Sequence, residues 1–188
     1  MTKHKTRISL AVCALALCLT ATTAQAASAH TKTVPVDATF VGQTKLDRVD
    51  CTTHLGVCEL YFSGVANYTG GRVRGVNTFA LHGHVVPAKG FVYINHTKFA
   101  GSIRGCGTGT ARNVGYGTID QIAPFGALSP QINPLKAGLG LREDYHTVPG
   151  SGTGAFVGGS GRGHVTAVTH LDNTSAGRAV GRVTCKVR

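Results

Sequence analysis

From residue 60 onward, apolar and polar side chains alternate with a period of two, and glycines interrupt this alternation at short intervals. One face of the stretch 72–85 consists of Val73, Gly75, Asn77, Phe79, Leu81, Gly83 and Val85. The other face consists mainly of Arg72, Arg74, Thr78, His82 and His84. Such alternation is typical of strands with one buried face, and apolar stripes of helical period are hard to find. The pattern predicts an all-β chain.

The same pattern predicts further strands. Alternation also covers 59–67 and 182–188, and the stretch 90–103, which contains the apolar run 91–94, is a candidate for a further pair of strands. The sequence Thr69-Gly70-Gly71 predicts a hairpin turn before the stretch 72–85. Roughly six to nine short strands imply either a β-sandwich or a closed antiparallel barrel. Glycines at 64, 75, 83 and 101 fit the tight coiling of a small barrel, but composition alone leaves both architectures open.

The N-terminus predicts export. Lys3, Lys5 and Arg7 precede an apolar run at 8–19, and small residues follow up to Ala26. This is the pattern of a secretory signal peptide at 1–26 that is cleaved after Ala26. A membrane anchor is the alternative, but the run is shorter than the roughly 20 apolar residues that span a bilayer. We therefore expect a secreted, extracellular protein with one domain at 27–188 and no transmembrane segment after cleavage.

Four cysteines remain after the expected cleavage, namely Cys51, Cys58, Cys106 and Cys185. An even number in an oxidising compartment implies two disulfides, for which three pairings are possible. We predict Cys51–Cys58, which closes a short loop, and Cys106–Cys185, which joins distant strands. The chain lacks the Cys-x-x-Cys pairs that zinc sites commonly use.

The expected mature chain is basic, with 16 Lys and Arg residues against eight acids. A basic protein suggests nucleic acid or an anionic surface as a partner. Its cations are spread along the chain, and aromatic residues do not interleave with them as a base-stacking platform requires. We therefore interpret them as solvated strand faces and expect no specific nucleic-acid partner. Weak attraction to an acidic envelope or polysaccharide is the alternative.

One segment, at 119–137, departs from the alternation. Pro124, Pro130 and Pro134 lie there among large apolar residues. Prolines at this density exclude a central strand. We expect this Pro-rich insert to pack over one end of the sheet, either as a fixed cover or as a movable lid.

The stretch Gly152-Thr153-Gly154-Ala155-Phe156, followed by Gly161, resembles the Gly-Thr-Gly-x-Phe turn of plant dirigent proteins, and allene oxide cyclases have a similar stretch. The longer Val-Pro-Gly-Ser-Gly-Thr-Gly motif at 148–154 is similar to one in an uncharacterised family of secreted bacterial proteins with the same barrel. The stretch 106–110 also resembles a strand opening in that family. The resemblance implies a single closed antiparallel barrel of about eight strands, but it transfers no catalytic residue. Because a glycine cluster permits close backbone approach, we expect Phe156 to anchor this connection in the core.

The strand that leads into this motif carries the candidate catalytic residues. Its apolar face consists of Leu139, Leu141, Glu143, Tyr145 and Thr147. If the leucines point into the barrel, Glu143 and Tyr145 do so too. A carboxylic acid with a raised pKa beside a phenol could perform acid–base chemistry on a small ligand. The alternative is a bulge that reverses the register and exposes Glu143 to solvent.

Metal and cofactor sites have little support. His82 and His84 lie on one strand face and are weak candidate metal ligands. A metal site needs a third ligand, for which His96, His146 and His164 remain open, and Arg72 and Arg74 on the same face would oppose a cation. The glycine-rich stretch 150–161 is no phosphate loop, because neither a Lys-Ser/Thr pair nor a helix follows it. We expect no cofactor and no metal.

Three functions remain compatible with the sequence. The first is a secreted barrel that binds a small apolar ligand in its lumen. The second is a cyclase or isomerase of the allene oxide cyclase or dirigent kind, and the third is a structural or interaction module of the cell envelope with a filled barrel. The fold does not distinguish among them. An open apolar cavity of roughly 300 Å³ or more with Glu143 or Tyr145 buried in it would favour the first two. A packed interior would leave only the third.

Overall fold

The computed structural model describes residues 30–54, 57–86, 89–119, 138–170 and 172–187. The expected signal peptide and nearly all of the Pro-rich insert lie outside the described residues. Within the described ranges, no helix has the length and the apolarity needed to cross a bilayer.

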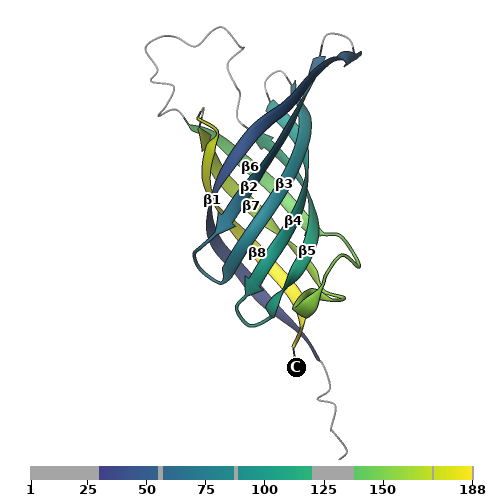
Figure 1. Ribbon diagram of the computed structural model, residues 1–188, viewed down its shortest axis with the longest axis vertical. Coiled ribbons are helices and arrows are strands. Elements are labelled where there is room, and N and C mark those ends of the chain that lie inside the picture. Colours follow the sequence, from purple (N-terminus) through teal and green to yellow (C-terminus); the bar gives the residue numbers. More distant parts are fainter. Residues whose placement is uncertain (1–29, 55–56, 87–88, 120–137, 171, 188) are drawn as a thin grey trace, which may run out of the picture.

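Eight antiparallel strands form one closed ring in sequence order (Figure 1). Their bounds are β1 His30–His54, β2 Val57–Tyr68, β3 Val73–Val86, β4 Gly90–Ile103, β5 Gly107–Ile119, β6 Gly138–Thr147, β7 Ser160–His170 and β8 Thr174–Val187. The ring closes between β1 and β8, whose pairing runs from His30 opposite Val187 to Gln43 opposite Thr174. The predicted closed barrel is confirmed, and the open sandwich is excluded.

Glycines on the inner face allow neighbouring backbones to approach closely. Gly75 on β3 lies opposite Gly101 on β4, and Gly163 on β7 lies opposite Gly181 on β8. A Cβ atom at Gly75 would lie 2.4 Å from the carbonyl oxygen of Ala100, and its φ of +150° is one that L-residues rarely adopt. The predicted link between inner-face glycines and tight coiling therefore has a steric basis.

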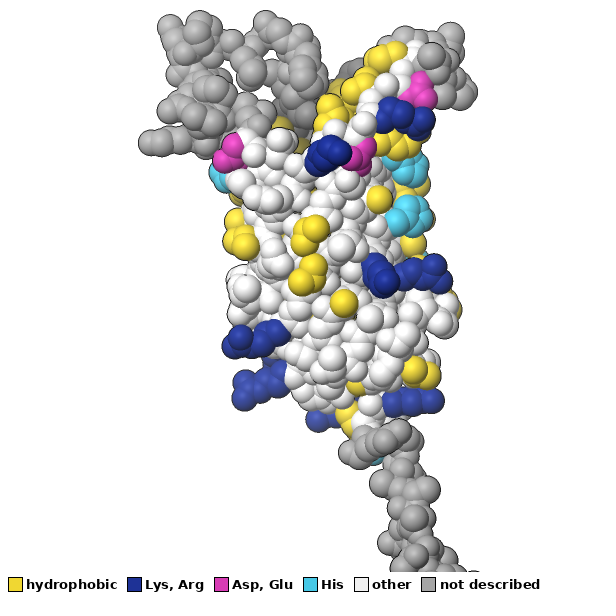
Figure 2. Space-filling view, viewed as in Figure 1, with side chains coloured by type: hydrophobic (Ala, Val, Ile, Leu, Met, Phe, Trp, Pro, Cys, Tyr) yellow, Lys and Arg dark blue, Asp and Glu magenta, His cyan; other side chains and the backbone are white. Residues whose placement is uncertain are grey.

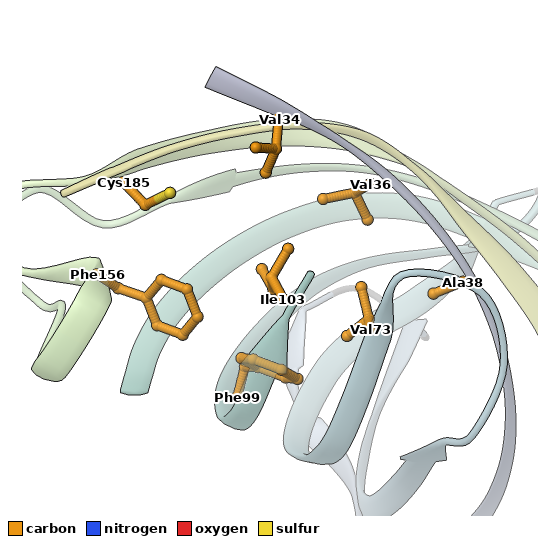
Figure 3. Close-up of a cluster of buried hydrophobic side chains, with 8 residues drawn as sticks. All are labelled: Val34, Val36, Ala38, Val73, Phe99, Ile103, Phe156 and Cys185. Atoms are coloured by element: carbon orange, nitrogen blue, oxygen red, sulfur yellow. The ribbon is translucent and has the colours of Figure 1, made fainter. Parts of the chain in front are cut away.

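Two apolar clusters fill the two ends of the lumen. Near the end that holds the C-terminus, called here the C-terminal end, the buried side chains of Val34, Val36, Ala38, Val73, Phe99, Ile103, Phe156 and Cys185 pack together (Figure 3). Toward the opposite end, Leu60, Leu81, Phe91 and Tyr93 form the second cluster. The site lies in the lumen, and several residues of the C-terminal cluster line its cavity.

Both predicted disulfides are present. Cys106–Cys185 connects the β4–β5 turn to β8 across 79 residues of sequence, and Cys185 is fully buried in the C-terminal cluster. Cys51–Cys58 joins the ends of β1 and β2, seven residues apart. The long-range bridge therefore fastens the last strand to the middle of the chain.

The glycine-rich segment forms the β6–β7 connection. Phe156 lies in the short 3₁₀ helix η1, Gly154–Phe156, and its buried ring packs 6.1 Å from that of Phe99. The predicted anchoring by Phe156 is confirmed. The following strand, β7, begins at Ser160.

Candidate functional site

A buried carboxyl group lies in the middle of the lumen. Leu141, Glu143 and Tyr145 occupy successive inward positions of β6, so the alternation that buries the leucine also buries Glu143, which is 8% exposed. The carboxyl group lies against Gly115 of the neighbouring strand β5, where a Cβ atom would come within 2.2 Å of Oε1. Glycine at this position leaves the space that Glu143 occupies.

Two side chains of β4 hold the Glu143 carboxyl group in place. The Tyr93 hydroxyl donates a hydrogen bond of 3.1 Å to Oε2, and Asn95 Nδ2 donates one of 2.9 Å to the same atom. Burial raises the pKa of Glu143, and the two hydrogen bonds offset this increase only in part. Both bonds end on Oε2, whereas Oε1 lies against the Gly115 backbone.

Phenol groups lie beside this carboxyl group. Tyr145 lies two positions further along β6, and burial together with the nearby Glu143 raises its pKa to about 12. Burial also raises the pKa of Tyr68, on the opposite wall. Both hydroxyl groups therefore stay protonated at neutral pH and can donate hydrogen bonds. Glu143 and Tyr145, the two predicted catalytic candidates, line one cavity.

A second polar group lies nearer the C-terminal end of the same cavity. Asn113 Nδ2 donates to Thr97 Oγ1 at 3.2 Å, and Thr147 Oγ1 donates to Asn113 Oδ1 at 2.9 Å. Asn77 Oδ1 is buried without a hydrogen-bond partner among the described residues, and Asn77 lines the cavity. An unpaired buried acceptor is costly, so this oxygen is a natural contact for a donor on a ligand or for water.

The cavity itself is small. It has a volume of about 90 Å³, and its apolar wall includes Val36, Val73, Phe99, Ile103, Phe156 and Val165. Its lining continues to Gly159, Thr184 and the exposed Ser160, so it reaches the surface beside η1. This volume falls short of the roughly 300 Å³ expected for a drug-sized ligand site. A molecule bound here is therefore small, or it extends out of the opening.

The weak metal candidates lie elsewhere. His82 and His84 point outward from β3, and the His82 ring stacks on Tyr61 with 5.6 Å between centroids. Both histidines line an open groove on the outer face rather than the lumen. The described ranges contain no group of three His, Cys, Asp or Glu side chains that could hold a metal ion.

The sequence interpretation missed Tyr93, Asn95, Thr97 and Asn113, and it placed Asn77 and Thr147 on inward faces without giving them a role. It also expected a pair of strands at 90–103, where the structure has the single strand β4. A signal was present for β4, because residues 91, 93, 95, 97, 99 and 103 alternate with outward polar or β-branched residues. Applied to 91–103, the rule that identified Glu143 would have placed Tyr93 and Asn95 inside the barrel. Which of them meets Glu143 depends on the β4–β5–β6 register, which the sequence does not specify.

The arrangement can hold a molecule with one oxygen-bearing group. Protonated Glu143 and Tyr145 can donate to an acceptor oxygen, and Asn77 can accept from a hydroxyl group. The buried acid could also transfer a proton to a bound oxygen. The sequence matches no protein-family model and no curated protein.

Proposed function

We propose that this barrel binds a small, mainly apolar molecule with one oxygen-bearing group in its lumen. The observation that carries the proposal is the buried Glu143 carboxyl group, held by Tyr93 and Asn95 and facing a largely apolar cavity. Burying a carboxyl group and an unpaired amide oxygen costs stability. A ligand that hydrogen-bonds to these groups offsets that cost.

The cavity volume limits the ligand. A cavity of about 150 Å³ can hold benzene, and the lumen provides about 90 Å³. A ring of this size would therefore enter the cavity only in part and extend into its opening. The oxygen-bearing group would lie at Glu143 and Tyr145, and the apolar part would run along Phe99 and Ile103 toward the opening beside Ser160.

Export and family membership belong to the same proposal. Two disulfides support an oxidising compartment, because such bridges are rare in reducing cells. The closed ring of eight strands and the Phe156 turn support membership of the allene oxide cyclase/dirigent-like superfamily. We propose that the protein acts outside the cell.

A matched pair of probes tests ligand binding. Cyclopentanone and methylenecyclopentane have nearly the same shape, but only the ketone accepts a hydrogen bond. We expect both to shift the NMR signals of Asn113 and Gly115, with the ketone binding about fivefold more tightly because one neutral hydrogen bond contributes about 1 kcal/mol. Equal affinities, or shifts confined to outer-face residues, would overturn the proposal.

Two variants complete this test. Ala111 lines the cavity, so Ala111→Leu should fill it and abolish binding of both probes. Thr110→Val, on the adjacent outward position, is the control and should leave binding unchanged. Retention of binding by Ala111→Leu would place the ligand outside the lumen.

An enzymatic role is the second candidate, and the raised pKa of Glu143 favours it. A protonated carboxyl group could donate a proton to the oxygen of a reactive intermediate, as a cyclase or isomerase requires. Glu143→Gln keeps the shape and removes the acid. Catalysis predicts loss of turnover with ligand affinity retained, whereas a binding protein shows no turnover in either form.

The small cavity favours the third candidate, a structural module with a filled barrel. In that case, both probes would leave the lumen signals unshifted at any accessible concentration. The NMR titration therefore separates this candidate from the first two.

A further inference from the structure

Charge is segregated along the axis of the barrel. Most of the exposed cations lie toward its C-terminal end, where Arg72 and Arg178 interact with Asp37. We call the other eight the basic collar: Lys32, Arg74, Lys98, Arg104, Arg112, Arg162, Arg182 and Lys186. Of the seven acids in the described ranges, Asp37 alone lies at this level. In the view of Figure 2, Asp and Glu side chains appear only in the upper part, and the lower part shows Lys and Arg without them.

The collar is not neutralised by the protein. Asp37 is bound by Arg178 through two hydrogen bonds of 2.7 Å, and Asp144, the next acid along the barrel, is bonded to His164. Within the described ranges, no collar cation forms an ion pair. The collar therefore presents its charge to solvent.

Cations also face each other directly across strand pairs. Lys98 on β4 lies opposite Arg112 on β5, and Arg162 on β7 lies opposite Arg182 on β8. Like charges at directly opposed positions destabilise a sheet. The two pairs therefore lower the stability of this end of the barrel, and a bound anion would reduce the repulsion between their charges.

We propose that the basic collar binds a flexible, linear, phosphate-bearing polymer that wraps around the C-terminal end of the barrel. Five of the eight cations are arginines, whose planar guanidinium groups suit paired hydrogen bonds to phosphate oxygens. The site is separate from the lumen: Arg74, Lys98, Arg112, Arg162, Arg182 and Lys186 occupy outward positions of their strands, and the exposed Lys32 and Arg104 lie at the rim of the C-terminal end.

The distribution of the cations favours a polymer over a membrane. They lie on β1, β3, β4, β5, β7 and β8 and in the β4–β5 turn, so they encircle the barrel. A flat bilayer that meets the side of the barrel would contact only one side of this collar, whereas a flexible chain can follow all of it. Base stacking is not part of the interaction, since the exposed Tyr116 ring lies beyond the collar and stacks on His146.

Long-chain inorganic polyphosphate is the probe, and two quadruple variants remove the same number of charges. The collar variant carries Lys98→Gln, Arg112→Gln, Arg162→Gln and Arg182→Gln. The control carries Lys45→Gln, Arg48→Gln, Lys89→Gln and Arg142→Gln, all exposed and nearer the opposite end. Thermal unfolding checks that both variants remain folded.

We expect the collar variant to bind polyphosphate at least tenfold more weakly than the wild type, and the control less than threefold more weakly. The dependence of log affinity on log salt concentration should also become shallower in the collar variant alone, because fewer counterions are released. Equal losses in the two variants would show that net charge, not the collar, attracts the polymer. If the protein bound phosphatidylglycerol vesicles more tightly per phosphate than it bound polyphosphate, the proposal of a polymer ligand would be wrong and a membrane would be the partner.

Discussion

Glu143 is surrounded by groups that act on its charge in opposite directions. Burial in the lumen favours the neutral acid, whereas the hydrogen bonds from Tyr93 and Asn95 favour the carboxylate. Burial has the larger effect, so the folded protein holds the Glu143 proton to a higher pH than the unfolded chain does. This difference links the protonation of one residue to the stability of the whole barrel.

The Glu143→Gln variant tests this linkage. Below the ordinary carboxyl pKa of 4.5, folded and unfolded chains both bind the proton. As the pH rises above it, the unfolded chain releases the proton first, so Glu143 lowers the free energy of unfolding by up to about 1.4 kcal/mol per pH unit until the folded carboxyl group also ionises. We expect Glu143→Gln to gain stability relative to the wild type across this window, as measured by urea unfolding at a series of pH values.

The outer-face substitution Glu59→Gln is the control for this experiment. Glu59 hydrogen-bonds to the Tyr61 hydroxyl on the outside of the barrel, so this variant should keep the pH dependence that Glu143 causes. A pH profile of Glu143→Gln parallel to that of the wild type would show that Glu143 ionises alike in both states.

Single inward glycines also determine how tightly the strands coil. A Cβ atom at Gly181 would lie 2.3 Å from the Arg162 carbonyl oxygen and 2.8 Å from the Gly163 Cα atom. Backbone atoms cannot move aside as a flexible side chain can. We therefore expect Gly181→Ala to lower the free energy of unfolding by about 1–3 kcal/mol, as overpacking does elsewhere.

The neighbouring exposed position supplies the comparison. Val180→Ala, on the outer face, should change the free energy of unfolding by less than about 0.5 kcal/mol. If denaturant unfolding gave Gly181→Ala the stability of the wild type, close backbone approach would not be what requires glycine there.

At the scale of strands and turns, the disulfides differ in what they join. Cys106–Cys185 ties the β4–β5 turn to the last strand, whereas Cys51–Cys58 staples two strands that are already neighbours. A bridge stabilises the fold chiefly by restricting the unfolded chain, and the restriction grows with the length of the closed loop.

Removing each disulfide should therefore have a different effect. We expect Cys106→Ala with Cys185→Ala to lower the free energy of unfolding by about 4 kcal/mol, and Cys51→Ala with Cys58→Ala by about 2 kcal/mol. Denaturant unfolding of the two double variants measures both values. A larger loss from the shorter bridge would contradict the loop-entropy explanation.

The elements differ in how well the sequence predicted them. Alternation predicts the inner face of β3, because this signal lies within a single strand. Cysteine spacing predicts both disulfides, because four cysteines allow only three pairings. The strand containing Tyr93 and Asn95 was recognised as apolar, but its polar inner positions were not. Tyr93 and Asn95 on β4 contact Glu143 on β6 across the intervening strand β5. This contact depends on the register of all three strands, which the sequence does not specify.

For the whole molecule, closure of the ring decides whether a lumen exists at all. Strand periodicity alone left the sandwich and the barrel equally open, since both bury one face of each strand. Closure rests on the long β1–β8 pairing, between residues more than 130 positions apart in the sequence. The basic collar is likewise a property of the whole molecule, because cations spread along the chain come together only when the ring closes.

Closure predicts the absence of free edges among the described strands. Backbone amides of β1 and β8 that pair with each other should exchange with deuterium as slowly as those of the central pair β3–β4. Hydrogen-exchange mass spectrometry measures this directly. Fast exchange confined to 30–43 and 174–187 would indicate an open sheet in solution.

The most direct test of a ligand-binding lumen is to locate a bound molecule. The barrel carries valines on both faces: Val73 and Val165 line the cavity, whereas Val41, Val65 and Val76 are exposed on the outside. With methyl-labelled protein and cyclopentanone, we predict intermolecular nuclear Overhauser effects to the methyl groups of Val73 and Val165. Effects to the outer valines alone would contradict a ligand-binding lumen.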